Sequence, residues 1–337
     1  MKQRQNLLWG SLPCLALGAA AWVMAKYIPT YGKLIGGPVF AILLGMIFAF
    51  IKRPEAMTPG ITFCGKKILQ YSIILIGFGM NIGTVLKTGS QSLLVMLCPI
   101  AASLLTAFFV GKLLNVEKNT ATLIGVGTSI CGGSAIAATA PVIDADDREV
   151  AYSISTIFLF NILAVFIFPA LGRALHMTDT GFGVWAGTAI NDTSSVVAAG
   201  FAFSDAAGEL STIVKLTRTL MIIPITLALA LWRARKEKSR GDTAGSGYSI
   251  AKIFPWFVIG FLLTAIINST GVLPGAASSF LNDLGKFGIM VAMAGIGLGT
   301  NLKSLFRNGL RPIILGLCCW FMVAVVSLAV QSLVGLI

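Results

Sequence analysis

Charged side chains are scarce in this sequence. Only 11% of its 337 residues are Asp, Glu, Lys or Arg, whereas 56% are hydrophobic. Soluble globular domains carry about 25% charged residues. The deficit excludes a soluble enzyme, a disordered chain and a typical nucleic-acid-binding protein, in spite of a formal net charge of +12. The composition instead predicts an all-α, polytopic membrane protein whose main partner is the lipid bilayer.

The sequence also has little from which to build a catalytic or metal centre. Its six cysteines form no Cys-x-x-Cys pair and show no metal-ligand spacing, and its single histidine, His176, falls in a predicted loop. An intramembrane enzyme would need a nucleophile within reach of a base, and Asp192 with Ser194 is a weak pair. The phosphate-binding motif Gly-x-x-x-x-Gly-Lys-Ser/Thr is absent as well. We therefore expect no enzyme activity, cofactor or metal, and an energy source in an ion gradient or a separate subunit.

Long apolar runs dominate what is present. About 20 mostly apolar residues span a bilayer, and eleven segments approach this length: residues 7–25, 34–51, 68–86, 88–111, 119–143, 150–172, 181–204, 211–232, 253–269, 287–302 and 312–337. They predict a single transmembrane domain over residues 1–337. The one long linker, residues 233–252, is basic and then rich in Gly and Ser, which is typical of a flexible cytoplasmic loop.

The basic residues indicate the topology. With the N-terminus in the cytoplasm and alternating segments, most of the 25 Lys and Arg residues fall on the cytoplasmic side, as the positive-inside rule requires. The basic start is followed by an apolar run without a cleavage site, so we expect a retained first helix. The sequence thus predicts a multi-pass protein of the bacterial inner membrane with a cytoplasmic N-terminus. It is compatible with an oligomer and gives no sign of a nucleic-acid partner.

One internal repeat is visible. Residues 77–89 read GFGMNIGTVLKTG, and residues 297–309, at an offset of 220, read GLGTNLKSLFRNG. In the predicted topology the two copies run in opposite directions through the membrane. Inverted repeats are typical of secondary transporters, although glycine-rich packing seams can also resemble one another by chance.

The first candidate for a substrate site is the segment 125–143, GVGTSICGGSAIAATAPVI. Glycines lower helix stability, and hydroxyl groups compete for backbone hydrogen bonds. Unwound backbone is tolerated in lipid only where protein or a water-filled cavity covers it. We expect two half-helices that meet at a polar break, with a kinked packing helix as the alternative. The predicted substrate-binding residues are Gly127, Thr128, Ser129, Gly132, Gly133 and Ser134.

A second stretch repeats this pattern 60 residues later. Residues 187–199 read GTAINDTSSVVAA. Two broken segments with polar centres indicate a substrate site at mid-membrane, and the positive N-terminal ends of half-helices favour an anion. The second set of predicted substrate-binding residues is Asn191, Thr193, Ser194 and Ser195.

Three charged residues accompany these breaks. Asp192 is the only acidic residue in the interior of a predicted segment. An ionisable group at that depth indicates function, so we expect Asp192 to bind a proton or Na⁺ that drives transport. Lys215 and Arg218 lie three residues apart, on one helix face, and would attract or hold the anion. The alternative is structural: Asp192 pairs with these cations, or the cations snorkel.

Four motifs carry a resemblance to a known family. SICGGSAIAATAPVI, GTAINDTSSVVAAG, KLTRTLMIIP and AMAGIGLGTNLKSL resemble the YeiH family, UPF0324, also described as sulfate exporters. The resemblance covers nearly the whole chain; many members carry a His-Glu pair where this chain has Asn191 and Asp192. It implies the inverted-repeat fold of the bile acid/sodium symporter-like superfamily, broken helices at the site, and sulfate, sulfite or an organosulfonate as substrate.

Two questions stay open at this stage. Residues 119–143 and 181–204 either span the membrane or form re-entrant hairpins that enter from opposite sides, and the charge distribution fits both arrangements equally. The function predicted is gradient-driven transport of a small anion, with a passive channel or a membrane sensor as alternatives.

Overall fold

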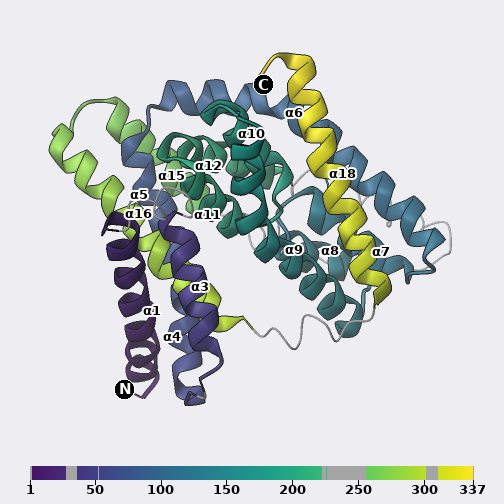
Figure 1. Ribbon diagram of the computed structural model, residues 1–337, viewed down its shortest axis with the longest axis horizontal. Helices are drawn as coiled ribbons and strands as arrows, with labels where there is room; N and C mark the ends of the chain where they lie inside the picture. The colour runs from purple at the N-terminus through teal and green to yellow at the C-terminus, as the bar shows by residue number, and fades with distance from the viewer. Residues whose placement is uncertain are drawn as a thin grey trace, which may run out of the picture.

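The structure is a computed structural model that describes residues 2–27, 36–51, 53–221, 225, 256–300 and 310–336. All regular secondary structure in these ranges is helical, as the composition predicts (Figure 1). The predicted cytoplasmic loop at residues 233–252 lies outside the described residues.

Six helical stretches of the described chain are long and apolar enough to cross a membrane: Asn6–Tyr27, Glu55–Gly79, Val95–Leu113, Asp147–Ala174, Gly275–Gly299 and Leu310–Val334. Four shorter apolar helices accompany them: Gly37–Ala49, Gly133–Val142, Thr193–Phe203 and Trp256–Ser269. These lengths describe a multi-pass helical membrane protein. The described part of the chain has fewer full-length candidate spans than the eleven apolar segments expected from sequence.

The boundaries predicted for residues 68–86 are wrong. The helical stretch Glu55–Gly79 ends before an extended residue, Met80 (φ −117°, ψ 150°), and α6 (Ile82–Leu113) then starts at a cap, where Asn81 Oδ1 accepts from the Gly83 N–H at 2.8 Å. α6 also continues through Lys87, which separates the predicted segments 68–86 and 88–111. The length of an apolar run does not reveal a side-chain cap. Such a cap accepts hydrogen bonds from the free N–H groups of the first helical turn, and a new helix can therefore start within an apolar run.

The helices form two groups. The first bundle contains α1 (Lys2–Tyr27), α3 (Gly37–Ala49), α4 (Thr58–Phe63), η2 (Cys64–Ile68), α5 (Leu69–Ile76), α15 (Trp256–Ser269) and α16 (Gly275–Gly299); it lies on the left in Figure 1. Small residues let membrane helices approach closely. A Cβ on Gly45 of α3 would lie 2.9 Å from the Cα of Gly297 on α16, so this contact requires glycine.

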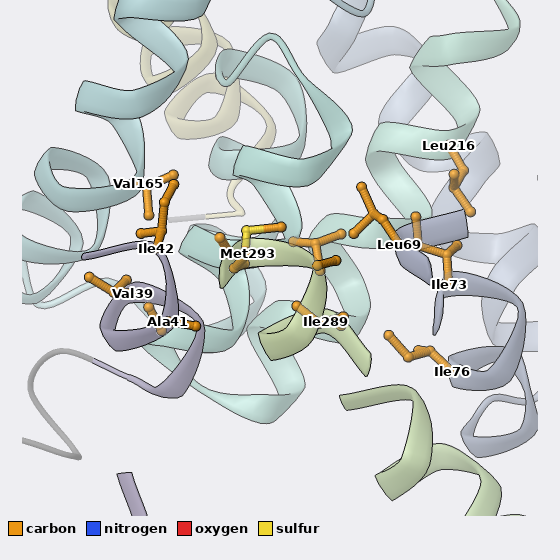
Figure 2. Close-up of a cluster of buried hydrophobic side chains, with 14 of the residues drawn as sticks. Val39, Ala41, Ile42, Leu69, Ile73, Ile76, Val165, Leu216, Ile289 and Met293 are labelled. Carbon is orange, nitrogen blue, oxygen red and sulfur yellow. The ribbon is translucent and has the colours of Figure 1, made fainter. Parts of the chain in front are cut away.

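The second group, which we call the hairpin bundle, contains α6, α7 (Lys118–Ser129), α8 (Gly133–Thr139), α9 (Asp147–Ala174), α10 (Asp179–Ala189), α11 (Thr193–Phe203), α12 (Asp205–Leu220) and α18 (Leu310–Val334). The Trp185 indole N–H donates to the Ala324 carbonyl at 3.0 Å and fixes α10 to α18. An apolar cluster joins the two bundles. Figure 2 shows Ile42 and Met293 of the first bundle beside Val165 of α9.

α7 and α8 form the first hairpin. The Asn119 side chain, at the start of α7, donates to Glu149 Oε2 in the first turn of α9 at 3.1 Å. Near the break between α7 and α8, the Ile136 side chain of α8 packs against Gly127 of α7. A Cβ built on Gly127 would lie 3.0 Å from the Ile136 side chain. The chain therefore enters and leaves this hairpin at the N-terminal end of α9.

α10 and α11 form the second hairpin, with the opposite orientation. Ser204 Oγ donates to Asp179 Oδ1 at 2.6 Å, and the rings of Phe182 and Phe203 stack with centroids 4.0 Å apart. The Arg173 guanidinium, at the C-terminal end of α9, donates to the Ala202 carbonyl. α9 has 28 residues, a length of about 42 Å. The two hairpins thus start from opposite ends of α9.

The two copies of the internal repeat, which lie 220 residues apart in the sequence, begin with related structures. Gly77–Gly79 ends one helix before the extended residue Met80, and Gly299 ends α16 before the extended residue Thr300 (φ −74°, ψ 125°). The helices are antiparallel, because Gly79 approaches Asn282 near the start of α16 whereas Gly65 approaches Ile296 near its end. Residues 301–309 lie outside the described part of the chain, so the repeat is traced through its first residues alone.

Candidate functional site

The first hairpin turns at a short break between α7 and α8. Ile130 (φ −119°, ψ −89°) leaves the helix, and Gly132 adopts φ 70° and ψ −128°. This is a backbone region that glycine alone adopts readily. The predicted residues Gly127, Thr128 and Ser129 are the last turn of α7, and Gly133 is the first residue of α8.

The second hairpin turns at the equivalent place, 60 residues later. Ile190 ends α10 in an extended conformation, and Asp192 caps α11 by accepting from the Ser194 N–H at 3.0 Å and from the Ser194 hydroxyl. The Asp192 N–H donates to Oδ1 of Asn161, near the middle of α9, at 3.2 Å. A Cβ built on Gly132 would lie 3.6 Å from the Cβ of Asp192. The tips of the two hairpins therefore meet halfway along α9.

Lys215 and Arg218 of α12 lie between the tips and are fully buried. Lys215 Nζ donates to the carbonyls of Ile130 at 2.7 Å and Ile190 at 3.0 Å. Arg218 donates to the Ser129 carbonyl at 2.9 Å, to the Ile190 carbonyl at 3.2 Å and to the Thr128 carbonyl. Both cations thus bind the free carbonyls at the C-terminal ends of α7 and α10, where helix dipoles concentrate negative charge.

The structural alternative, an ion pair between Asp192 and these cations, is not present in the described part of the chain, where the polar contacts of Lys215 and Arg218 are backbone carbonyls. Asn191 is also fully buried, and neither atom of its amide group has a hydrogen-bond partner among the described residues. The cations organise the backbone of the tips, whereas Asp192 belongs to the start of α11.

A cavity of about 650 Å³ lies between the hairpin tips and the first bundle. The N-termini of α8 and α11 border it. From the hairpin bundle its lining includes Gly133, Ser134, Ala137, Ile154, Ile157, Phe158, Asn161, Asp192, Thr193 and Ser194. From the first bundle it includes Ile61, Thr62, Gly65, Lys66, Leu69, Gln70, Ile73, Phe257, Gly295, Ile296 and Gly299.

The predicted site residues divide into two sets. Five line the cavity: Gly133, Ser134, Asp192, Thr193 and Ser194. Eight are buried behind it at or near the tips: Gly127, Thr128, Ser129, Gly132, Asn191, Ser195, Lys215 and Arg218. Sequence reasoning missed the lining contributed by the first bundle, including Lys66 and Gln70. The available signal was a lysine pair and a glutamine inside an otherwise apolar stretch.

A second cavity, of about 880 Å³, lies between the same two bundles near the open end of the second hairpin. On α11, Ser194 borders the first cavity and Phe201 the second; on α16, Gly295 borders the first and Met290 the second. Between these positions lie Ala198 on α11 and Met293 on α16. Both side chains are buried and belong to the apolar cluster of Figure 2. This cluster separates the two cavities.

Comparison with known proteins gives full-length matches. A family model described as conserved hypothetical protein 698 matches residues 10–316. The chain is 48% identical to a UPF0324 membrane protein of Streptococcus pyogenes serotype M6 and 46% identical to one of Streptococcus mutans serotype c, over 100% of both chains in each case. It is 44% identical to a UPF0324 membrane protein of Fusobacterium nucleatum, over 98% of this chain and 99% of that one.

Proposed function

Because this chain belongs to the UPF0324 family of membrane proteins, we propose that it is a gradient-driven secondary transporter of a small anion in the bacterial inner membrane. The observation that carries the proposal is the meeting of two helix breaks at a cavity between two bundles. Broken helices that end at a binding site near mid-membrane are typical of secondary transporters. The family name itself says only that the protein is in a membrane.

In this proposal the two hairpins are re-entrant and enter the membrane from opposite faces. Their open ends lie at opposite ends of α9, which is long enough to cross the bilayer. Non-helical backbone at membrane depth must be covered by protein or line a cavity. The tips satisfy this condition because their carbonyls bind Lys215 and Arg218 and their other side borders the cavity.

The charges around the tips favour an anion. A helix N-terminus carries about +0.5 and a C-terminus about −0.5 elementary charge. The partial charges at the N-termini of α8 and α11 therefore approximately cancel those at the C-termini of α7 and α10. The two buried basic side chains outnumber the single carboxylate of Asp192, and charges act strongly across a weakly screening interior. Lys66 adds a further cation on the opposite wall of the cavity.

The proposed cycle is alternating access. The first bundle rocks against the hairpin bundle, and the apolar cluster around Ala198 and Met293 separates the site from one side of the membrane at a time. Asp192 is the proposed binding group for the coupling proton or Na⁺. A sulfur oxyanion, either sulfate, sulfite or an organosulfonate, is the proposed substrate, in accord with the family resemblance. The cavity has room for the organic group of a sulfonate.

The test is anion binding followed by transport. A ligand that binds only the folded state raises stability by RT ln(1 + [L]/Kd), so sulfate, sulfite or methanesulfonate should raise the Tm of the detergent-purified protein relative to matched chloride salts. In proteoliposomes, uptake of the stabilising anion should depend on a proton or Na⁺ gradient. No shift with any of the three at millimolar concentration would reject a sulfur oxyanion as substrate.

Asp192→Asn tests the coupling role, with Asp147→Asn, at an exposed position in the first turn of α9 that lines neither cavity, as the matched control. Asn is as good a helix cap as Asp, so the fold of α11 should persist while the charge is lost. We expect gradient-driven uptake to fall at least tenfold in Asp192→Asn and to stay near wild type in Asp147→Asn. Unchanged flux in Asp192→Asn, without gradient dependence in the wild type, would favour a passive channel.

A further inference from the structure

Lys66 provides the one charged side chain of the first bundle among the described lining of the 650 Å³ cavity. It lies in η2, a π-helical turn that interrupts the candidate span Glu55–Gly79 near its middle. π turns inside helices recur at functional sites. The Lys66 side chain is exposed, and it has no hydrogen-bond or ion-pair partner among the described residues.

The position of Lys66 in the helix changes how the residue is interpreted. In the sequence, Lys66 and Lys67 lie between the predicted segments 34–51 and 68–86, outside every apolar run. In the structure both lie within one continuous helical stretch. An ionisable side chain in the interior of a span, facing a cavity, indicates a functional role. Lys67 differs from its neighbour, because its ammonium lies 5.5 Å from the centre of the Trp256 ring and does not line the cavity.

We propose that Lys66 is a substrate ligand that binds the anion from the first bundle, while the start of α11 and Ser134 bind it from the hairpin bundle. The inference rests on the proposed function. A lysine ammonium offers three donors and a full charge to an oxyanion. Gln70, four residues on, faces the same cavity with a buried Oε1 that has no hydrogen-bond partner among the described residues, and its NH₂ group is a further donor.

This ligand set links substrate binding to the movement of the bundles. An anion that contacts Lys66 on one side and Ser134 and the first turn of α11 on the other is held by both bundles at once. A ligand shifts a conformational equilibrium only through different contacts in the two states. Because the contact with Lys66 depends on the distance between the bundles, the anion stabilises the arrangement in which they are closest at the cavity.

The test compares two neighbouring lysines. Anion dissociation constants are measured for Lys66→Gln, Lys66→Arg and, as the matched control, Lys67→Gln, with sulfate, sulfite and methanesulfonate as probes. Loss of a charged hydrogen bond should raise the Kd of Lys66→Gln by about 10- to 100-fold. Lys67→Gln should bind like the wild type, and Lys66→Arg should recover most of the affinity. Since Lys66 is exposed and makes no ion pair or hydrogen bond with the described part of the chain, the ligand-free Tm of Lys66→Gln should equal that of the wild type.

The outcomes separate this proposal from the function on which it rests. If the wild type binds an anion and Lys66→Gln binds it as tightly as Lys67→Gln does, Lys66 is not a ligand, although the transporter proposal stands. If the wild type binds none of the three probes, the proposed substrate class fails, and the role of Lys66 fails with it.

Discussion

At the scale of single residues, the most consequential contacts are those of Lys215 and Arg218. Both are fully buried, and their donors reach the carbonyls of two separate helix ends. Ile190 O accepts from both cations, so one carbonyl is shared between them. Basic side chains stabilise helix C-termini by binding the last carbonyls and opposing the dipole. Here the same two side chains also connect the tips of two hairpins.

Lys215→Ala should therefore destabilise the fold. It leaves the Ile130 and Ile190 carbonyls with fewer donors in a buried place, at a cost of about 1–3 kcal/mol for each unsatisfied group. The matched control is Lys286→Ala, which removes a partly exposed ion pair with Asp205 (2.9 Å), worth about 0–1 kcal/mol. In detergent, the Tm should fall by several degrees more for Lys215→Ala. Equal Tm values, with anion binding lost only in Lys215→Ala, would show that Lys215 touches the substrate instead.

At the scale of secondary-structure elements, the two hairpins resemble each other in detail. Each has a helix that ends at an isoleucine, Ile130 or Ile190, whose carbonyl accepts from Lys215. Each then starts a new helix at the cavity, at Gly133 or Thr193. The second break is capped by the Asp192 carboxylate, whereas the first depends on the backbone of Gly132. A glycine with positive φ and a side-chain cap are thus two solutions to the same sharp turn.

Gly132→Ala tests this role of the backbone. A Cβ there would meet its neighbours at ordinary distances, 3.4 Å or more, so the penalty is conformational, about 1–3 kcal/mol for a residue held in this region. Gly133→Ala is the matched control, because Gly133 is helical and a Cβ there meets no atom within 4 Å; alanine should be neutral or stabilising by up to about 1 kcal/mol. Thermal unfolding in detergent distinguishes the two, and equal stability would argue against a strained tip.

At the scale of the whole molecule, two cavities lie on either side of one apolar cluster. The 650 Å³ cavity reaches Thr62 and the N-terminal half of α9, whereas the 880 Å³ cavity reaches Trp22 and Lys26 at the end of α1. With a cytoplasmic N-terminus, α1 ends on the periplasmic side, so the second cavity should open there. In the proposed transporter, this arrangement corresponds to a site that is open to the cytoplasm and closed by the cluster on the other side.

Thiol labelling should report these two openings. In a background in which Cys98 and Cys318 are replaced by Ser, Asp283→Cys lines the second cavity and Thr62→Cys the first, and both positions are exposed. A membrane-impermeant maleimide should label Asp283→Cys in intact spheroplasts and Thr62→Cys only in inside-out vesicles. Labelling of both positions from the same side would contradict the opposite orientation of the cavities.

The sequence was informative where local chemistry decides the structure. Low charge and long apolar runs predicted a helical, multi-pass membrane protein, which the structure and the full-length relatives confirm. The motifs identified the family, also confirmed. Glycine and hydroxyl clusters in lipid marked both helix breaks, because a continuous helix is unfavourable at those residues. The substrate, the coupling role of Asp192 and the membrane topology stay predictions.

Other features depended on tertiary structure. Apolar run length could not show that residues 181–204 fold back as a pair of helices, since a continuous helix is equally apolar; contacts such as that of Ser204 with Asp179 show it. The sequence also could not show that Lys215 and Arg218 bind carbonyls. Every residue has a backbone carbonyl, and only the folded structure determines which carbonyls lack a partner within their helix. The sequence by itself determined which residues are polar inside the membrane. Packing decided that Lys66, which the sequence places between two apolar segments, lies within a helical stretch and faces a cavity, and that Lys215 holds the helix ends together.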